Sequence, residues 1–134
     1  MKLHASLLLA CVLAAASSCT AGTNDTELRS VTRAEALDLI ERDDGPLFLD
    51  VRSTSEFATG HVPGAINIPH GELAKRLDDL EAQRDREIVL YCERGVRAEI
   101  AADVLAQAGF RSLAHLEGDM SAWRQERLPM QRQP

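Results

Sequence analysis

The sequence is poor in cysteine, in aromatic residues and in long apolar runs. Three cysteines in 134 residues are too few for the disulfide framework of a small secreted scaffold. Aromatic residues make up 4% of the chain, but 45% of the residues are hydrophobic, which is enough for one domain to bury a core. The net charge of −6 argues against nucleic acid or an anionic lipid surface as a partner. We therefore expect one folded domain with a targeting segment, and no nucleic-acid partner.

Residues 1–18 are predicted to form a secretory signal peptide rather than part of the fold. Lys2 supplies a positive start, and residues 3–16 form an apolar run, shorter than the about 20 residues that a membrane-spanning helix needs. The sequence Ala16-Ser17-Ser18-Cys19 resembles the lipobox of bacterial lipoproteins, in which the cysteine is lipidated and becomes the new N-terminus. Ordinary cleavage near residues 14–21, without a lipid, is the alternative.

The lipobox resemblance implies a membrane location. Residues 19–30 would then form a lipidated tether between Cys19 and the domain. Thr20, rather than an aspartate, follows Cys19, which favours the outer membrane in a Gram-negative host. We expect an exported, periplasmic lipoprotein that contacts the membrane only through its N-terminal lipid anchor.

The positions of the three cysteines leave one thiol in the domain. Cys11 would be removed with the signal peptide, and Cys19 would be lipidated or lie at the extreme terminus, so that Cys92 remains. A lone thiol in an oxidising compartment is exposed to oxidation unless it is used or deeply buried. The pattern therefore favours a functional thiol at Cys92, with a buried structural cysteine as the alternative.

Apolar periodicity predicts an α/β fold. Thr32 and Glu35 form a capping-box pattern that opens a helix ending near Glu41. Further helices are predicted at 54–59, 71–83, 98–108 and 119–126, and strands at 47–51, 65–68, 87–91 and 112–116. This alternation predicts a parallel sheet of about five strands with helices on both faces. We place the domain at residues 31–130 and a short tail at 131–134.

The loop that follows the predicted strand at 87–91 is the strongest functional candidate. It places Cys92 at the carboxyl end of a buried strand, where open α/β sheets bind their ligands. Gly95 permits a positive φ, and the N–H groups of so short a loop before a helix can converge on the sulfur and stabilise a thiolate. Arg94 and Arg97 add positive charge that suits an anionic substrate.

Several motifs occur in one order along residues 31–130. They are Asp50-Val51-Arg52, Glu56-Phe57, Gly60-His61-Val62-Pro63-Gly64-Ala65-Ile66-Asn67-Ile68-Pro69, Cys92-Glu93-Arg94-Gly95-Val96-Arg97, Leu116-Glu117-Gly118, Ala122-Trp123 and Leu128-Pro129. In this order they resemble the signatures of single-domain rhodanese-type sulfurtransferases. The resemblance implies a rhodanese-like fold and a sulfurtransferase that needs no cofactor. Such an enzyme moves sulfane sulfur from thiosulfate or a similar anionic donor to a thiol or cyanide, through a persulfide on Cys92.

The resemblance also assigns roles at the site. It makes Cys92 the nucleophile and Glu93, Arg94, Gly95, Val96 and Arg97 the loop that surrounds the substrate. Asp50 and Arg52 end a strand at the same sheet edge, where they either support the site or form a purely structural ion pair.

Two positions depart from the family pattern. Glu93 stands where many members carry a neutral or basic residue, and we expect it to weaken the attraction for an anionic donor. Asp119 and Met120 stand where a second glycine and an aromatic residue are common, a difference expected to alter only the local turn.

Two other functions stay open. Cysteine phosphatases and arsenate reductases also use a loop between a strand and a helix, but their signature has one residue more than the four between Cys92 and Arg97. A non-catalytic persulfide carrier or binding module would have this same sequence. Among the histidines, we expect His61 to fix a loop, His70 to lie at the surface or rim, and His115 to belong to a strand. No Cys/His cluster has metal-ligand spacing, and a monomer is the expected state.

Overall fold

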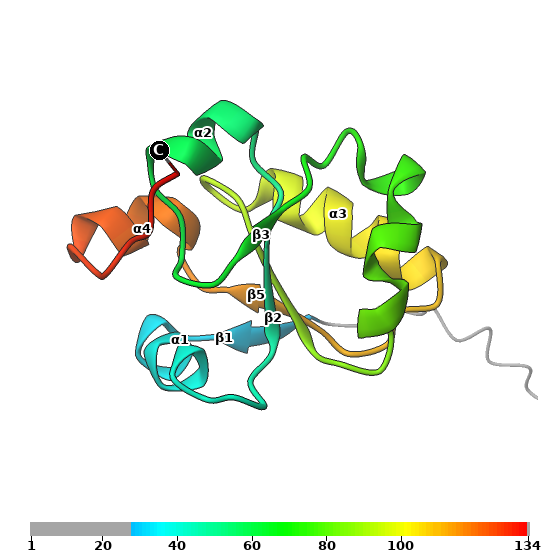
Figure 1. Cartoon of the computed structure of the whole chain (residues 1–134), viewed down its shortest axis with the longest axis horizontal. Coiled ribbons are helices and arrows are strands. Elements are labelled where there is room, and N and C mark those ends of the chain that lie inside the picture. The colour runs from blue at the N-terminus through cyan, green and yellow to red at the C-terminus, as the bar shows by residue number, and fades with distance from the viewer. Residues whose placement is uncertain (1–27, 134) are drawn as a thin grey trace, which may run out of the picture.

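The computed structural model describes residues 28–133, which form a five-stranded parallel sheet with helices on both faces (Figure 1). The strands are β1 (Arg29–Val31), β2 (Leu47–Asp50), β3 (Ile66–Asn67), β4 (Ile88–Tyr91) and β5 (Leu113–Leu116). Their order in the sheet is β1-β5-β4-β2-β3, and every pairing is parallel. The predicted α/β class and the number of strands are confirmed.

Two sets of helices cover the two faces of the sheet. One face carries α1 (Arg33–Ile40) and α4 (Asp119–Gln125), and the other carries α3 (Val96–Gln107) with the 3₁₀ helices η1 (Leu73–Lys75) and η2 (Leu77–Gln83). The short helix α2 (Thr54–Thr59) lies beyond the end of β2. Because both faces are covered, all four residues of β2 and all four of β4 are buried, as the near-continuous apolar runs predicted.

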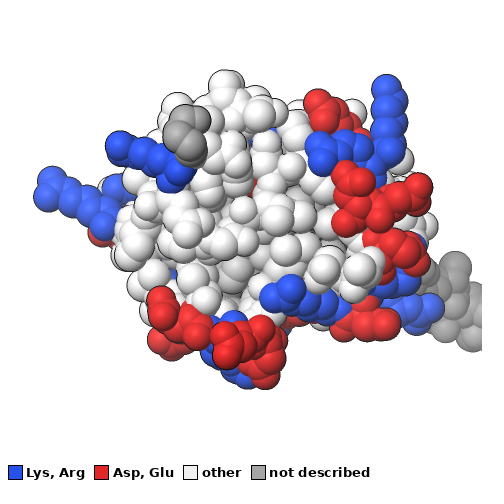
Figure 2. All heavy atoms as spheres, in the orientation of Figure 1, with Lys and Arg blue, Asp and Glu red and all other residues white. Residues whose placement is uncertain are grey.

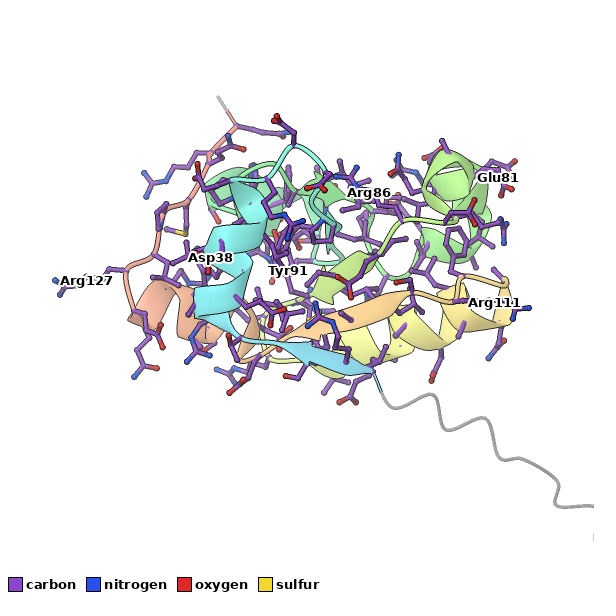
Figure 3. All side chains as sticks on the ribbon, turned by 90° about the horizontal axis from the view of Figure 1, so that it is seen from below. Asp38, Glu81, Arg86, Tyr91, Arg111 and Arg127 are labelled. Atoms are coloured by element: carbon purple, nitrogen blue, oxygen red, sulfur yellow. The ribbon has the colours of Figure 1, made fainter. Side chains whose placement is uncertain are left out.

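The alternation of side chains along β4 decides which face the site lies on. Ile88, Leu90 and Cys92 belong to the core beneath α3, whereas Val89 and Tyr91 belong to the core beneath α1 and α4. Cys92 therefore lies on the α3 side, at the end of the strand that feeds this helix. Tyr91 lies in the interior, while Arg111 and Arg127 point outward (Figure 3).

Charged side chains gather over α1 and over the 3₁₀ helices, and they surround a broad uncharged centre on the face that Figure 2 shows. Many of them form local ion pairs, such as Arg76 with Asp79 and Arg84 with Glu81. Both signs are interspersed, so this face has no extended field of one sign.

The predicted domain limits need two corrections. Arg29 and Ser30, which the sequence placed in the tether, belong to β1 and pair with Ala114 and His115 of β5. At the other end Gln131, assigned to the tail, forms an antiparallel bridge with His61. The fold therefore includes residues on both sides of 31–130. The rest of the tether, the signal peptide and Cys19 lie outside the described residues.

Two local predictions also change. The segment 71–83 was predicted as one helix, but it forms two 3₁₀ helices, which still bury Leu73 and Leu80. The capping box at Thr32 is half formed, because the side chain of Glu35 binds Arg29 instead of returning to the cap. A complete capping box occurs in α2, where Glu56 accepts the backbone N–H of Ser53.

The first prediction concerns β1. Val31→Ala in the full chain should lower the free energy of unfolding by about 2 kcal/mol, because Val31 is fully buried in the core against β5. Ser30→Ala, one residue earlier and exposed, is the matched control and should change it by less than about 0.5 kcal/mol. Urea denaturation measures both. Equal, negligible effects would mean that the domain begins after β1.

Candidate active site

The loop between β4 and α3 brings the sulfur of Cys92 to the N-terminus of a twelve-residue helix. The Cys92 side chain is almost fully buried, and its Sγ accepts a hydrogen bond from the Gly95 N–H at 3.0 Å. The prediction that loop N–H groups approach the sulfur is therefore confirmed for Gly95. The next N–H groups, in the first turn of α3, have no acceptor within the helix, because a first turn lacks preceding carbonyls. The sulfur thus lies at the positive end of the helix.

Gly95 is required at its position for two reasons. Its φ of +108° lies in a region that other residues rarely adopt, as predicted. A Cβ there would also lie 3.4 Å from Asp119 Oδ2 and 3.5 Å from His115 Cε1, so the loop packs closely on these two side chains. The tight curl around the sulfur depends on the missing side chain.

Arg97 is anchored at the rim of the site by Glu56. Its two terminal nitrogens bind the two Glu56 oxygens at 2.7 and 2.9 Å, and Glu56 Oε2 also accepts the N–H and hydroxyl of Ser53. The Arg97 guanidinium holds the pKa of Glu56 well below its usual range. The Arg97 charge is therefore shared with a carboxylate, and the α2 cap is connected directly to the active loop.

Glu93 and Arg94, which follow Cys92, differ in whether their charges are paired. The carboxylate of Glu93 pairs with Arg124 of α4 and lies 3.7 Å from Arg52 Nη1. Arg94 is exposed, and within residues 28–133 no carboxylate lies within salt-bridge distance of it. The negative charge of Glu93 is thus compensated by two arginines, and the positive charge of Arg94 remains available to a ligand.

Asp50 and Arg52 form a buried ion pair below the loop. Their exposed fractions are 0% and 1%, and Arg52 donates from its backbone N, Nε and Nη2 to the Asp50 carboxylate. Arg52 Nη2 also binds the Gly60 carbonyl at 2.8 Å. These contacts are those of a buried ion pair, and Arg52 also approaches the active loop through Glu93.

Asp119 is the site residue that sequence reasoning missed. It was expected to affect only a turn, yet it is buried and its Oδ1 accepts the Cys92 N–H at 2.8 Å. Both of its carboxylate oxygens lie 3.1 Å from His115 Nε2. Its φ of +53° is a conformation that aspartate tolerates better than most residues. The sequence contained one signal for this role: Asp119 replaces the glycine that is common in the family, and it lies four residues after His115.

The remaining histidines agree with their predicted roles. His61 is buried, its Nδ1 lies 2.8 Å from the Phe57 carbonyl, and its ring stacks on Phe57. His70 is half-buried, and His115 lies in β5 as expected. Within residues 28–133, no group of three or more His, Cys, Asp or Glu side chains is placed to hold a metal ion.

Comparison with known proteins agrees with this geometry. A family model described as a rhodanese-like domain matches residues 32–126. An HTH-type transcriptional regulator of Mycobacterium tuberculosis is 43% identical over 103 residues, which cover 75% of this chain but only 44% of the regulator. A putative sulfurtransferase of Bacillus subtilis is 31% identical over 103 residues, which cover 77% of this chain and 97% of that protein.

A solved structure has the same fold. The crystal structure of a rhodanese-related protein from Thermoplasma volcanium matches with a TM-score of 0.65 and 32% identity, over 78% of this chain and 99% of that one. The family model covers well over half of the sequence and includes β4, the Cys92 loop and α3. The chain therefore belongs to the rhodanese-like domain family.

Proposed function

We propose that the protein is a sulfurtransferase that carries sulfane sulfur as a persulfide on Cys92. The observation that carries the proposal is the position of the Cys92 sulfur, which accepts the Gly95 N–H at the N-terminus of α3. A persulfide places a negative charge one atom beyond Sγ. Preorganised N–H donors and a helix N-terminus stabilise such a charge without further rearrangement.

The reaction follows from this geometry in two displacements. The Cys92 thiolate attacks the outer sulfur of thiosulfate, the S–S bond of the donor breaks, and sulfite leaves with the electron pair. A thiolate or cyanide acceptor then attacks the outer sulfur of the persulfide, and the electron pair of that S–S bond returns to Cys92. Each step breaks one sulfur bond and forms one bond to sulfur, so neither a cofactor nor an external oxidant is needed.

The charges at the mouth of the site suit an anionic donor. Arg94 is exposed in the loop that carries Cys92, while Arg97 and Arg124 each share their charge with one carboxylate. The loop is one residue shorter than that of a cysteine phosphatase, with four residues between Cys92 and Arg97, and this arginine is bound to Glu56 instead of being free to hold a phosphate. Both features favour sulfur over phosphate as the group transferred. The fixed pairing of Glu93 also reduces the penalty that its charge was expected to impose.

Replacement of the nucleophile tests the function. Cys92→Ser should reduce steady-state sulfur transfer from thiosulfate to cyanide by more than about a hundredfold, because a serine hydroxyl stays protonated at neutral pH. Cys19→Ser makes the same replacement at the other cysteine of the processed chain, outside the domain, and is the matched control that should leave turnover unchanged. Near-normal turnover of Cys92→Ser would remove Cys92 as the nucleophile. Wild-type protein that completes one transfer but does not turn over would be a persulfide carrier.

The location is part of the proposal. We propose that the chain is exported and that Cys19 carries the lipid that holds the domain at a membrane, because Lys2, the apolar run 3–16 and the lipobox-like sequence before Cys19 follow the lipoprotein order. Residues 28–133 contain no helix that is long and apolar enough to cross a bilayer. A lipoprotein with two or more acyl chains would be stably attached, whereas one chain binds only marginally.

Cell fractionation with a fatty-acid analogue tests this location. Wild-type protein should carry the label and sediment with membranes, while Cys19→Ala should lose the label and become soluble or remain unprocessed. Cys11→Ala, within the signal peptide, is the matched control and should label as wild type does. A wild-type protein that is soluble and unlabelled would indicate simple secretion.

A further inference from the structure

A buried carboxylate lies directly behind the proposed nucleophile. Asp119 is 2% exposed, begins α4, and binds the Cys92 backbone N–H rather than a group in solvent. This contact provides an acceptor for the buried Cys92 N–H, which does not bind the sulfur. It also places the Asp119 carboxylate against the backbone of Cys92, close to the thiolate of the same residue. Like charges in a low-dielectric site raise the free energy of both anions.

His115 is the group that can cancel this charge. Its Nε2 lies 3.1 Å from both Asp119 oxygens, and the pair packs against the side of Gly95 where a Cβ would lie. The His115 side chain is 24% exposed, whereas that of Asp119 is 3% exposed. The imidazole can therefore exchange a proton with solvent, and the carboxylate is shielded from it. Protonation of His115 changes the net charge of the pair from negative to zero.

The surroundings of His115 favour its protonated form. It borders a groove of about 460 Å³, which is lined also by Glu99 and Asp103 of α3 and by Leu28 and Ser30 at β1. The titratable groups near the imidazole are thus Asp119 from α4 and these two acids from α3, and none of the other lining residues within 28–133 is basic. The hydrogen bond that His115 donates to Asp119 raises the pKa of His115 above its ordinary 6.5, burial opposes the shift, and the charge of Glu99 adds to it. The proton is therefore retained to a higher pH than on an ordinary imidazole, and the stability that it contributes is lost as the pH rises through the pKa of the folded state.

We propose that His115, as an imidazolium, neutralises Asp119 behind the active loop and thereby stabilises the thiolate and persulfide forms of Cys92. His115 is then a positioning residue that makes the nucleophile pH-sensitive, although it does not contact the substrate. The persulfide part of this inference rests on the sulfurtransferase function proposed above. The thiolate part rests on the geometry alone, because it concerns the protein without a sulfur donor.

The test measures Cys92 thiolate directly, by the rate of alkylation with iodoacetamide as a function of pH. His115→Gln keeps an N–H donor for Asp119 but cannot take up a proton. It should move the midpoint of Cys92 alkylation upward by about half to one pH unit and slow alkylation below the midpoint about three- to tenfold. Adding Asp119→Asn keeps an acceptor for the Cys92 N–H and removes the uncompensated charge. The double variant should return toward the wild-type midpoint.

Three controls make the result decisive. Trp123 fluorescence and urea denaturation verify that each variant is folded. Glu99→Gln removes a more distant charge near His115 and should move the midpoint less than His115→Gln does. The proposal would be overturned if the alkylation midpoint of His115→Gln equalled that of the wild type. It would also be overturned if His115→Gln and the double variant shifted the midpoint equally, because the contact between His115 and Asp119 would then be only structural. If His115→Gln shifts the midpoint but the wild-type protein takes no sulfur from thiosulfate, the charge pair stands and the sulfurtransferase function fails.

Discussion

The chain must turn from a buried strand into a helix within a few residues and do so around one sulfur atom. The Gly95 N–H donates to Cys92 Sγ at 3.0 Å, and this contact requires the positive φ of Gly95. The curl in turn directs the Cys92 N–H away from the sulfur, toward the buried carboxylate of Asp119. Because β4 lies between β5 and β2, the residues that follow these two strands, among them Asp119 and Arg52, lie near the loop.

Four pairs of titratable side chains lie around this loop. Glu56 holds Arg97 at the rim, Glu93 contacts Arg124, Asp50 holds Arg52 below, and Asp119 holds His115 behind. Breaking a buried pair such as Asp50–Arg52 by removing one partner costs about 3–5 kcal/mol, because it leaves an uncompensated charge. A rigid frame of this kind keeps the Gly95 N–H aimed at the sulfur before a substrate arrives, so we expect little reorganisation in the change from thiolate to persulfide.

The sequence predicted the elements whose signals are local. Apolar runs indicated β2 and β4, a short helix was predicted at 54–59 where α2 lies, and the Cys92 loop followed from its place between a strand and a helix. β1 was missed because only Val31 of its three residues is buried, and so short a segment shows no alternation of apolar and polar residues. The 3₁₀ helices were missed because their leucines fit a helical spacing equally well. Asp119 was missed because its contact with Cys92 joins residues 27 apart, and only the packing of α4 brings them together. The complete burial of Asp50 and Arg52 depends on tertiary packing, which a sequence does not give.

The central claim is that the Cys92 sulfur accepts and holds a second sulfur atom. Intact mass spectrometry of the purified protein after incubation with thiosulfate, followed by peptide mapping, measures this most directly. The account predicts a gain of one sulfur atom on the peptide that contains Cys92, which is lost again when cyanide or a thiol is added. An unchanged mass, or a sulfur atom found on any other residue, would contradict it.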